Sequence, residues 1–435
     1  MTSAAVVIVA VILLIILLVV GVPIPFAFSG VTIVLVAILG YDPSFLIPAS
    51  YGKINSLVLL CIPLFMLAGA IIREGKIGDA LIGFVEQFVG KLKTGLGIVT
   101  VLTCAIFGAI SGSSAATLSA VGSIMAPKLE ERGYPRGQIA AMLASSSVLG
   151  LLIPPSAAQI LYAWSSGTSV LACFLATIVP GLICATLFCF VQHFQVRNVP
   201  AINEKPVQQI DMHFKPVMKR TGRAIPALLM PVIILGGIYG GFLTTMEAAA
   251  VAAVYCVPVA ICVYRGMKFK DLWPTIVEAC YGCGAVAMML MSCGILSRIF
   301  TTERVPDMLV NATMSLTTNK TAILLLLNLI MVILGMLMDD GSAIVLSTPL
   351  LLPIALSIGV DPVHYAAIMG VNLGMGLVTP PCAPMLFLGA QVAKSPASEA
   401  FKPTMQFILF AWLPALIITT FIPQISLFLP HLILG

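Results

Sequence analysis

Long apolar runs separated by short polar stretches dominate the pattern of this chain. Runs of about 18 or more apolar residues recur without strand alternation, so they predict helices that cross a membrane. The first two cover about 4–20 and 24–40, and a third covers about 55–72. Residues 77–93 differ, because apolar side chains recur at helical spacing with Asp, Glu and Lys between them. This pattern predicts an amphipathic helix at the membrane surface.

Two later segments are interrupted near their middle by small, polar or proline residues. Residues 96–128 contain Ser111–Ser114 between two apolar arms. Arms of about 15 residues would rise only about 22 Å in a hydrocarbon core of roughly 30 Å, so they predict a re-entrant hairpin. Residues 137–164 predict a span broken at Pro154-Pro155, and residues 170–196 predict a continuous span.

The same order of segments returns in the second half of the chain. The predicted elements are spans at about 224–241, 246–264 and 274–299, an amphipathic piece at 303–318, a hairpin at 321–358 with its break at Asp339–Ser342, a helix at 363–393 broken at Pro380-Pro381, and a last span at 405–430. Landmarks repeat at a shift of about 226–228 residues, as in Gly108 with Gly335 and Pro154-Pro155 with Pro380-Pro381. An internal repeat of this length indicates duplicated halves.

The predicted fold is an all-α polytopic membrane protein built from two repeats. Residues 1–196 form the first repeat, 197–223 a polar linker, and 224–435 the second repeat. Each repeat has five spans, a re-entrant hairpin and a broken helix. Because an odd number of crossings separates equivalent positions, the second repeat is predicted to have inverted topology.

Composition and charge support the membrane assignment and orient the chain. Of its 435 residues, 60% are hydrophobic and 9% are charged, with a mean hydropathy of +1.11, which excludes a soluble domain. With the linker in the cytoplasm, the predicted loops place all but four of the 22 Lys and Arg on that side; the exceptions are Lys53, Arg298, Arg304 and Lys320. Both termini and the opening of the second hairpin then lie on the outer face, and the first hairpin opens from the cytoplasm.

Several other features have structural interpretations. The 11 cysteines, including Cys280 and Cys283, are interpreted as packing residues, and the run from Ala4 to Val20 as a first span rather than a removed signal peptide. Thr244 and Glu247 form a capping box, and His364 has a structural role, whereas Glu278 lacks an obvious partner. No nucleotide-binding or hydrolase motif is present, and no basic patch suggests nucleic acid, so we expect no enzyme and no organic cofactor.

The helix breaks are the candidate binding sites. Backbone groups freed inside a membrane are costly unless protein or a ligand satisfies them. Ser111–Ser114 supply hydroxyls and Gly150–Pro155 supply carbonyls, which suit a hard cation such as Na⁺. Asp339, Asp340, Thr379 and the carbonyls that precede Pro381 would form a second cation site. The alternatives are that one carboxylate caps the next helix, or that Asp339 or Asp340 carries protons directly.

These segments resemble the large membrane subunit of tripartite ATP-independent periplasmic transporters. The resemblance covers essentially the whole chain and is carried by Phe107–Thr117, Arg132-Gly-Tyr-Pro135, Leu149–Ser156, Asp361-Pro-Val-His364 and Asn372–Pro381. It implies an elevator mechanism in the bacterial inner membrane, with both termini periplasmic. It also implies Na⁺ coupling, a small membrane subunit, here unfused, and a periplasmic binding protein that delivers an organic acid.

The resemblance also implies the site residues. One Na⁺ site would use Ser111, Ser114, Gly150 and Ile153, and the other Asp339, Gly341, Gly376 and Thr379. The tip reads Asp-Asp-Gly-Ser, where the family more often has Asp followed by apolar residues. The substrate set comprises Ser113, Ser114, Pro154, Ser156, Ser342 and Pro380. Because the region lacks a buried arginine, helix N-termini and hydroxyls would hold the carboxylate.

The sequence leaves the cargo and the coupling ion open. Sialic acids and C4-dicarboxylates are the common cargoes of the family, and the resemblance favours a sialic acid. A proton-coupled transporter that uses Asp339 or Asp340 is the main alternative. An ion channel would need a continuous polar pore, and a membrane enzyme would need clustered His and acidic residues at one interface; the sequence indicates neither.

Overall fold

The structure is a computed structural model that describes residues 3–89, 94–197, 199–200, 202 and 214–435. All regular secondary structure in these residues is helical, and eight of their helices are long and apolar enough to cross a membrane. The predicted all-α polytopic fold is therefore confirmed. Lys91, Lys93, Lys205 and most of the predicted linker lie outside the described residues.

The first half follows the predicted order of elements. Its helices are α1 (Ser3–Val19), α2 (Ile24–Leu39), α3 (Leu46–Ile54), α4 (Cys61–Glu74), α5 (Ile77–Val89), α6 (Gly95–Ser111), α7 (Ser114–Arg132), α8 (Arg136–Ser147), α9 (Leu149–Leu152), α10 (Ala157–Ser166) and α11 (Val170–Val196). α6 and α7 are the arms of the first hairpin. The broken helix consists of α8 and α9, followed by α10 after a bend of 44°.

The second half repeats the sequence of hairpin and broken helix. Its helices are α13 (Phe214–Tyr239), α14 (Thr245–Pro258), α15 (Phe269–Thr302), α16 (Val305–Leu316), α17 (Lys320–Leu337), α18 (Asp340–Ser357), α19 (Pro362–Val378), α20 (Pro384–Val392), α21 (Ala397–Phe407), α22 (Leu413–Phe421) and α23 (Pro423–Leu434). A π-helical turn, Val259–Val263, extends α14, and another, Ile408–Trp412, joins α21 to α22.

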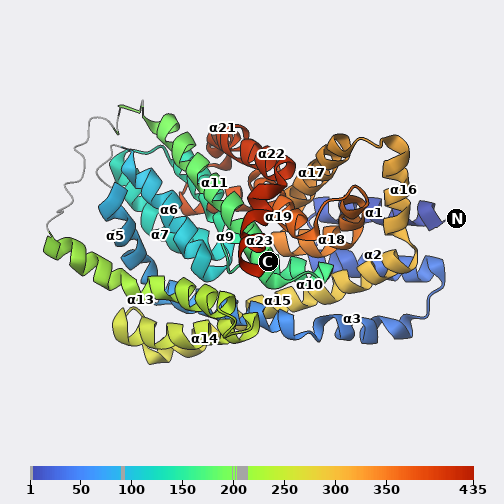
Figure 1. Cartoon of the computed structure of the whole chain (residues 1–435), viewed down its shortest axis with the longest axis horizontal. Coiled ribbons are helices and arrows are strands. Elements are labelled where there is room, and N and C mark those ends of the chain that lie inside the picture. The colour runs from blue at the N-terminus through green and yellow to red at the C-terminus, as the bar shows by residue number, and fades with distance from the viewer. Residues whose placement is uncertain (1–2, 90–93, 198, 201, 203–213) are drawn as a thin grey trace.

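Two groups of helices are visible in the packing. α2, α3 and α4 pack along the long helix α15, and α4 also packs on α14 (Figure 1). The hairpin helices α6 and α7 pack with α8, and α17 packs with α19. Contacts between α8 and α20 join the broken helices of the two halves, and α8 also packs against α21. The breaks therefore lie among helices drawn from both halves of the chain.

Several predicted boundaries were wrong. The third span, predicted at about 55–72, is not among them, because the apolar helical segment Leu57–Glu74 confirms it; a 3-10 turn at Leu57–Leu60 leads directly into α4. α13 begins at Phe214, ten residues inside the predicted linker, and the last span is divided at Ile422, between α22 and α23. Pro423 contributes to that division, because its ring excludes a donated backbone hydrogen bond at the start of α23.

The hairpins also differ from their predicted form. α6 and α7 have 17 and 19 residues, because α7 continues through the helix-favouring polar residues Lys128–Arg132. The second break is Met338–Asp339, not Asp339–Ser342, so Gly341 and Ser342 lie in the first turn of α18. This correction moves three of the four residues of the predicted second tip, Asp340–Ser342, onto the N-terminus of α18.

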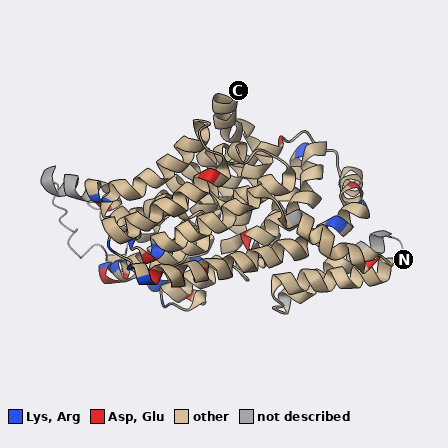
Figure 2. Ribbon diagram, turned by 90° about the horizontal axis from the view of Figure 1, so that it is seen from below, with Lys and Arg blue, Asp and Glu red and all other residues tan. Residues whose placement is uncertain are grey.

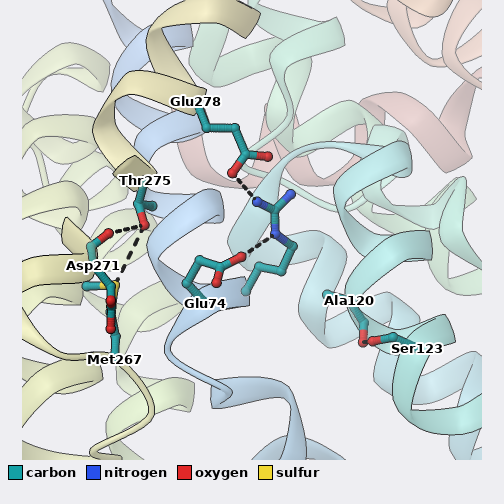
Figure 3. Close-up of polar contacts among 8 residues, drawn as sticks. Glu74, Ala120, Ser123, Met267, Asp271, Thr275 and Glu278 are labelled. Carbon is teal, nitrogen blue, oxygen red and sulfur yellow. Dashed lines mark hydrogen bonds and ion pairs between the residues drawn. The ribbon is translucent and has the colours of Figure 1, made fainter. Parts of the chain in front are cut away.

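Charged residues gather at one end of the molecule (Figure 2). Arg73 at the end of α4 donates to Glu278 Oε2 of α15 over 2.6 Å and to Glu74 Oε1 over 3.2 Å (Figure 3). Glu278, which had no evident partner in the sequence, is thus paired across two helices. The pair is partly exposed, so it orients α4 against α15 more than it stabilises the fold.

A backbone contact beside this pair is much less tolerant of change. A Cβ atom added to Gly266 would lie 2.1 Å from the carbonyl oxygen of Gly75, which is far inside van der Waals contact. Gly75 follows α4, and Gly266 lies in the loop before α15, so the two loops touch through their main chains. Only glycine fits at position 266 without displacing one of them.

We therefore expect Gly266→Ala to destabilise the purified protein by about 1–3 kcal/mol, the usual cost of overpacking. Gly284→Ala on α15 is the matched control, because a Cβ atom there would have no neighbour within 4 Å. Alanine favours a helix more than glycine does, so the control should unfold at the same or a higher temperature. Thermal unfolding in detergent measures both, and equal midpoints would contradict the close contact.

Candidate functional site

The first hairpin tip is a two-residue turn between α6 and α7. Gly112 has φ +62°, a left-handed conformation that favours glycine, and its N–H donates to Gly108 O over 2.8 Å. Ser113 caps α7, since its hydroxyl accepts from Ala116 N over 3.4 Å. The chain thus reverses direction inside the protein while keeping most of its backbone groups satisfied.

This tip is in direct contact with the first broken helix. A Cβ atom on Gly108 would lie 2.6 Å from Gly150 Cα, and one on Gly112 would lie 2.8 Å from Pro155 O. Ala157 N, at the start of α10, donates to Gly112 O over 3.2 Å. The structure therefore brings Ser111–Ser114 and Gly150–Ser156 together, as the sequence analysis expected of two walls of one site.

Buried oxygen atoms gather within the first tip and at the adjacent end of the break. The Ser111 hydroxyl lies 3.0 Å from Thr117 Oγ1 and 3.3 Å from Ser113 O, and the Thr117 hydroxyl donates to Ser113 O over 2.8 Å. Ser111 and Ser114 are both 3% exposed. Ser156 Oγ is buried without a hydrogen-bond partner among the described residues. Such buried hydroxyls and carbonyls can coordinate a hard cation.

Thr117 was missed in the sequence analysis. It lies one helical turn beyond Ser113, and its hydroxyl bonds back to the Ser113 carbonyl. Its place in the Ser-rich tip motif was the available signal. The predicted site residues of that motif ended at Ser114, however, so Thr117 was counted with the outgoing helix. The role of Thr117 is to hold the tip oxygens, because both Ser111 and Ser113 contact it.

The second tip has a carboxylate at the start of its outgoing helix. Asp339 caps α18: its carboxylate accepts from Ser342 N over 3.4 Å and also from the Ser342 hydroxyl. The same hydroxyl lies 2.7 Å from Met289 Sδ of α15. Asp339 is exposed, and Asp340 is half-buried. Of the two acids, Asp339 is therefore the one that caps the helix. Its carboxylate oxygens still have lone pairs for further ligands.

A glycine pair joins the second hairpin to the second broken helix. A Cβ atom on Gly376 would lie 2.7 Å from Gly335 Cα and 2.7 Å from Val332 O. Gly335 lies in the last turn of α17, close to Asp339 in the chain. The Thr379 hydroxyl donates to Met375 O over 2.6 Å, so its lone pairs remain available to a cation. This pair occupies the positions that correspond to Gly108 and Gly150 in the repeat predicted from the sequence.

The first broken helix also reaches the second tip. A Cβ atom on Gly341 would lie 3.3 Å from Leu161 Cδ1 of α10 and 3.3 Å from Met289 Cε. The start of α10 bonds to the first tip through Ala157, one turn before Leu161. α10 therefore contacts the first tip at its start and the first turn of α18 one helical turn further along.

The two breaks differ in exposure. Pro154, Pro155 and Ser156 are buried under the first tip, whereas Pro381 and Cys382 are exposed. Among the described residues, no group of three or more His, Cys, Asp or Glu could hold a metal ion. Any ion at these tips would therefore be bound by hydroxyl, carbonyl and single carboxylate oxygens.

These features define an all-helical polytopic membrane protein with two helical hairpins and two broken helices. Two solved structures share that fold: the Alcanivorax borkumensis YdaH transporter (TM-score 0.61, 14% identity, 90% of this chain and 89% of that chain) and Neisseria gonorrhoeae MtrF (TM-score 0.57, 13% identity, 87% and 84%). At such low identity the likeness concerns the fold alone.

Over residues 11–425 the chain matches the tripartite ATP-independent periplasmic transporter, DctM component, and it belongs to that family. It is 36% identical to the isethionate TRAP transporter permease protein DctMQ of Oleidesulfovibrio alaskensis, over 94% of this chain but only 64% of that protein's length. It is 36% identical to a C4-dicarboxylate large permease, DctM, of Pseudomonas aeruginosa (86% of each) and 28% identical to the sialic acid large permease SiaM of Vibrio cholerae (95% and 96%).

The unequal exposure of the two breaks predicts unequal thiol reactivity. In a chain with Cys262 and Cys280 replaced by serine, a water-soluble maleimide should modify Cys382 readily. A second chain that also carries Cys382→Ser and Ser156→Cys should react at least tenfold more slowly, because the first tip covers position 156. Mass spectrometry of the intact protein measures both rates, and equal rates would contradict the closed first break.

Proposed function

We propose that the chain is the transporting subunit of a Na⁺-coupled secondary transporter for an organic acid. One observation supports this most directly. Two hairpin tips each meet a broken helix through a close glycine pair, Gly108 with Gly150 and Gly335 with Gly376, beside buried oxygen atoms. Paired breaks of this kind are where secondary transporters bind substrate and coupling ions.

In this proposal the first tip holds one Na⁺ and the second tip holds another. Ser111, Ser114 and the carbonyls of Gly150 and Ile153 would be the first ligand set. Asp339, Thr379 and the carbonyls of Gly341 and Gly376 would be the second. A bound cation would offset the repulsion between the partially negative oxygen atoms at each tip. Ion binding would therefore favour the state in which the tip is closed against its broken helix.

The substrate would bind between the tips through its carboxylate. Ser113, Ser114 and Ser342 start helices, where free N–H groups and the helix dipole favour an anion. Pro154, Ser156 and Pro380 would line the same space. The relatives named for isethionate and C4-dicarboxylates are more similar to this chain than the relative named for sialic acid, which favours a small acid as cargo.

Partners and movement complete the proposal. The family is one component of a tripartite transporter, so a small membrane subunit and a periplasmic binding protein would act with this chain in the inner membrane, with both termini periplasmic. The unit that contains both hairpins and both broken helices would move as an elevator against helices such as α4, α14 and α15. The two inverted repeats, 1–196 and 224–435, would allow this unit to take up equivalent closed positions near each side of the membrane.

The first test is uptake by the chain reconstituted with its small subunit and binding protein. Accumulation of radiolabelled isethionate or C4-dicarboxylate should require an inward Na⁺ gradient and should stop when the binding protein is omitted. Dissipating the proton gradient with an ionophore should leave initial uptake unchanged. Uptake driven by protons without Na⁺ would overturn Na⁺ coupling, and conduction without any partner would indicate a channel.

Proton coupling is the second candidate, because Asp340 lies half-buried beside the exposed Asp339. Replacement of Asp340 by Asn removes its titration but keeps its size. Na⁺-driven uptake should survive in this variant, whereas a proton-coupled transporter would lose accumulation while retaining exchange of substrate across the membrane.

Replacing one tip oxygen tests the first Na⁺ site. Ser114→Ala should raise the Na⁺ concentration for half-maximal uptake about tenfold or more, because one buried ligand is lost. Ser123→Ala on the same helix is the control, since that hydroxyl only bonds to Ala120 O over 2.9 Å (Figure 3). If uptake and affinity are unchanged in Ser114→Ala, then Ser114 contacts neither ion nor cargo.

A further inference from the structure

A groove on the outside of the helix bundle is lined by none of the residues assigned to the hairpin tips. It runs between the end of α11 and the junction of α21 with its π-helical turn, and its volume is about 430 Å³. Its lining residues are Phe190, Val191, Phe194, Gln195, Gln406 and Phe410. Phe190, Phe194 and Phe410 are 58%, 61% and 65% exposed. Three exposed aromatic rings around one hollow form a site that an apolar chain could fill.

Buried aromatic rings join α11 to α21 and to the π-helical turn next to this groove. Phe188 stacks edge-on against Phe407 and Trp412, with ring centroids 5.8 Å and 5.1 Å apart, and all three rings are fully buried. Gln195 donates to Pro403 O over 3.0 Å and ties α11 to α21. Phe410 lies in the π-helical turn Ile408–Trp412, a distortion that is frequent at functional sites. The hollow is therefore part of the packed fold.

One end of the groove is basic and polar. The Arg197 guanidinium carbon lies 5.6 Å from the centre of the Phe194 ring. Lys402 is exposed one turn before Gln406 and next to Pro403, which accepts the Gln195 bond. Glu399, one turn further back on α21, accepts from the Ser395 hydroxyl over 3.2 Å. Two cations thus flank the point where the aromatic lining ends.

We propose that this groove binds one anionic phospholipid. An acyl chain would lie along Phe190, Phe194 and Phe410, and Gln406 would reach the ester oxygens. The phosphate would meet Arg197 and Lys402, because basic residues beside a membrane helix attract anionic headgroups. The order of apolar rings, amides and then cations along the groove matches the order of groups along a phospholipid.

Lipid retention tests this proposal. The full chain, with any membrane subunit that copurifies, is delipidated, incubated with phosphatidylglycerol or phosphatidylcholine, and analysed by native mass spectrometry. We expect one tightly held phosphatidylglycerol and at least tenfold weaker retention of phosphatidylcholine. In the double variant Arg197→Gln/Lys402→Gln the preference for phosphatidylglycerol should disappear, whereas Arg223→Gln/Lys270→Gln, which alters basic residues on α13 and α15, should retain it.

Replacement of aromatic residues tests the acyl chain separately. Phe190→Ala/Phe410→Ala should weaken retention of both lipids, and Phe26→Ala, on the exposed face of α2, should not. Equal retention of the two lipids by the unaltered chain would overturn the proposal. So would retention that appears only after a copurifying subunit is removed, because the groove would then be a subunit interface. Thermal unfolding identifies any variant that fails to fold.

Discussion

A helix that stops inside a membrane must satisfy its own backbone, and the structure depends on how this chain meets that requirement. Water is absent from the hydrocarbon core, so each free N–H or C=O group costs several kcal/mol. The first tip solves the problem with a left-handed glycine, a serine cap and a bond from Ala157 N to the Gly112 carbonyl. Close approach of backbone to backbone is therefore what allows the breaks to exist.

This constraint explains why glycines, rather than charged residues, identify the candidate sites. Gly108 and Gly150 touch at the first tip, and Gly335 and Gly376 touch at the second. A single methyl group on Gly108 or Gly376 would lie only 2.6–2.7 Å from the backbone of the facing element, so the two elements would have to move apart. The hydroxyl groups of Ser111 and Thr117 then serve two purposes, because they satisfy the backbone and leave lone pairs for a ligand.

The sequence predicted the order and type of nearly every element, because apolar runs and their interruptions follow directly from the demands of the bilayer. It also located both tips and both broken helices. It misplaced boundaries where polar residues continue a helix, as at Lys128–Arg132 and before residue 224, since solvent-exposed turns carry no hydropathy signal. It placed Asp340–Ser342 in a break because adjacent acids and glycine suggest a turn, whereas Asp339 caps a helix there.

Contacts between distant segments were beyond sequence reasoning. Neither the Arg73–Glu278 pair nor the approach of Leu161 to Gly341 follows from periodicity, because each joins elements far apart in the chain. The groove at α11 was missed for the same reason. Its phenylalanines look like ordinary lipid-facing residues until α21 brings Gln406 and Lys402 beside them.

The length of α15 has a mechanical consequence. Its 34 residues rise about 51 Å, whereas a bilayer core is about 30 Å thick. Membrane helices rarely tilt by more than about 40°, and even that tilt leaves α15 longer than the core. At least one of its ends must therefore project beyond the hydrocarbon, where charged groups such as the Arg73–Glu278 pair are inexpensive. A thinner or thicker bilayer would then change the tilt of α15 and of the helices packed along it. The thickness of the membrane therefore exerts a force on this part of the protein.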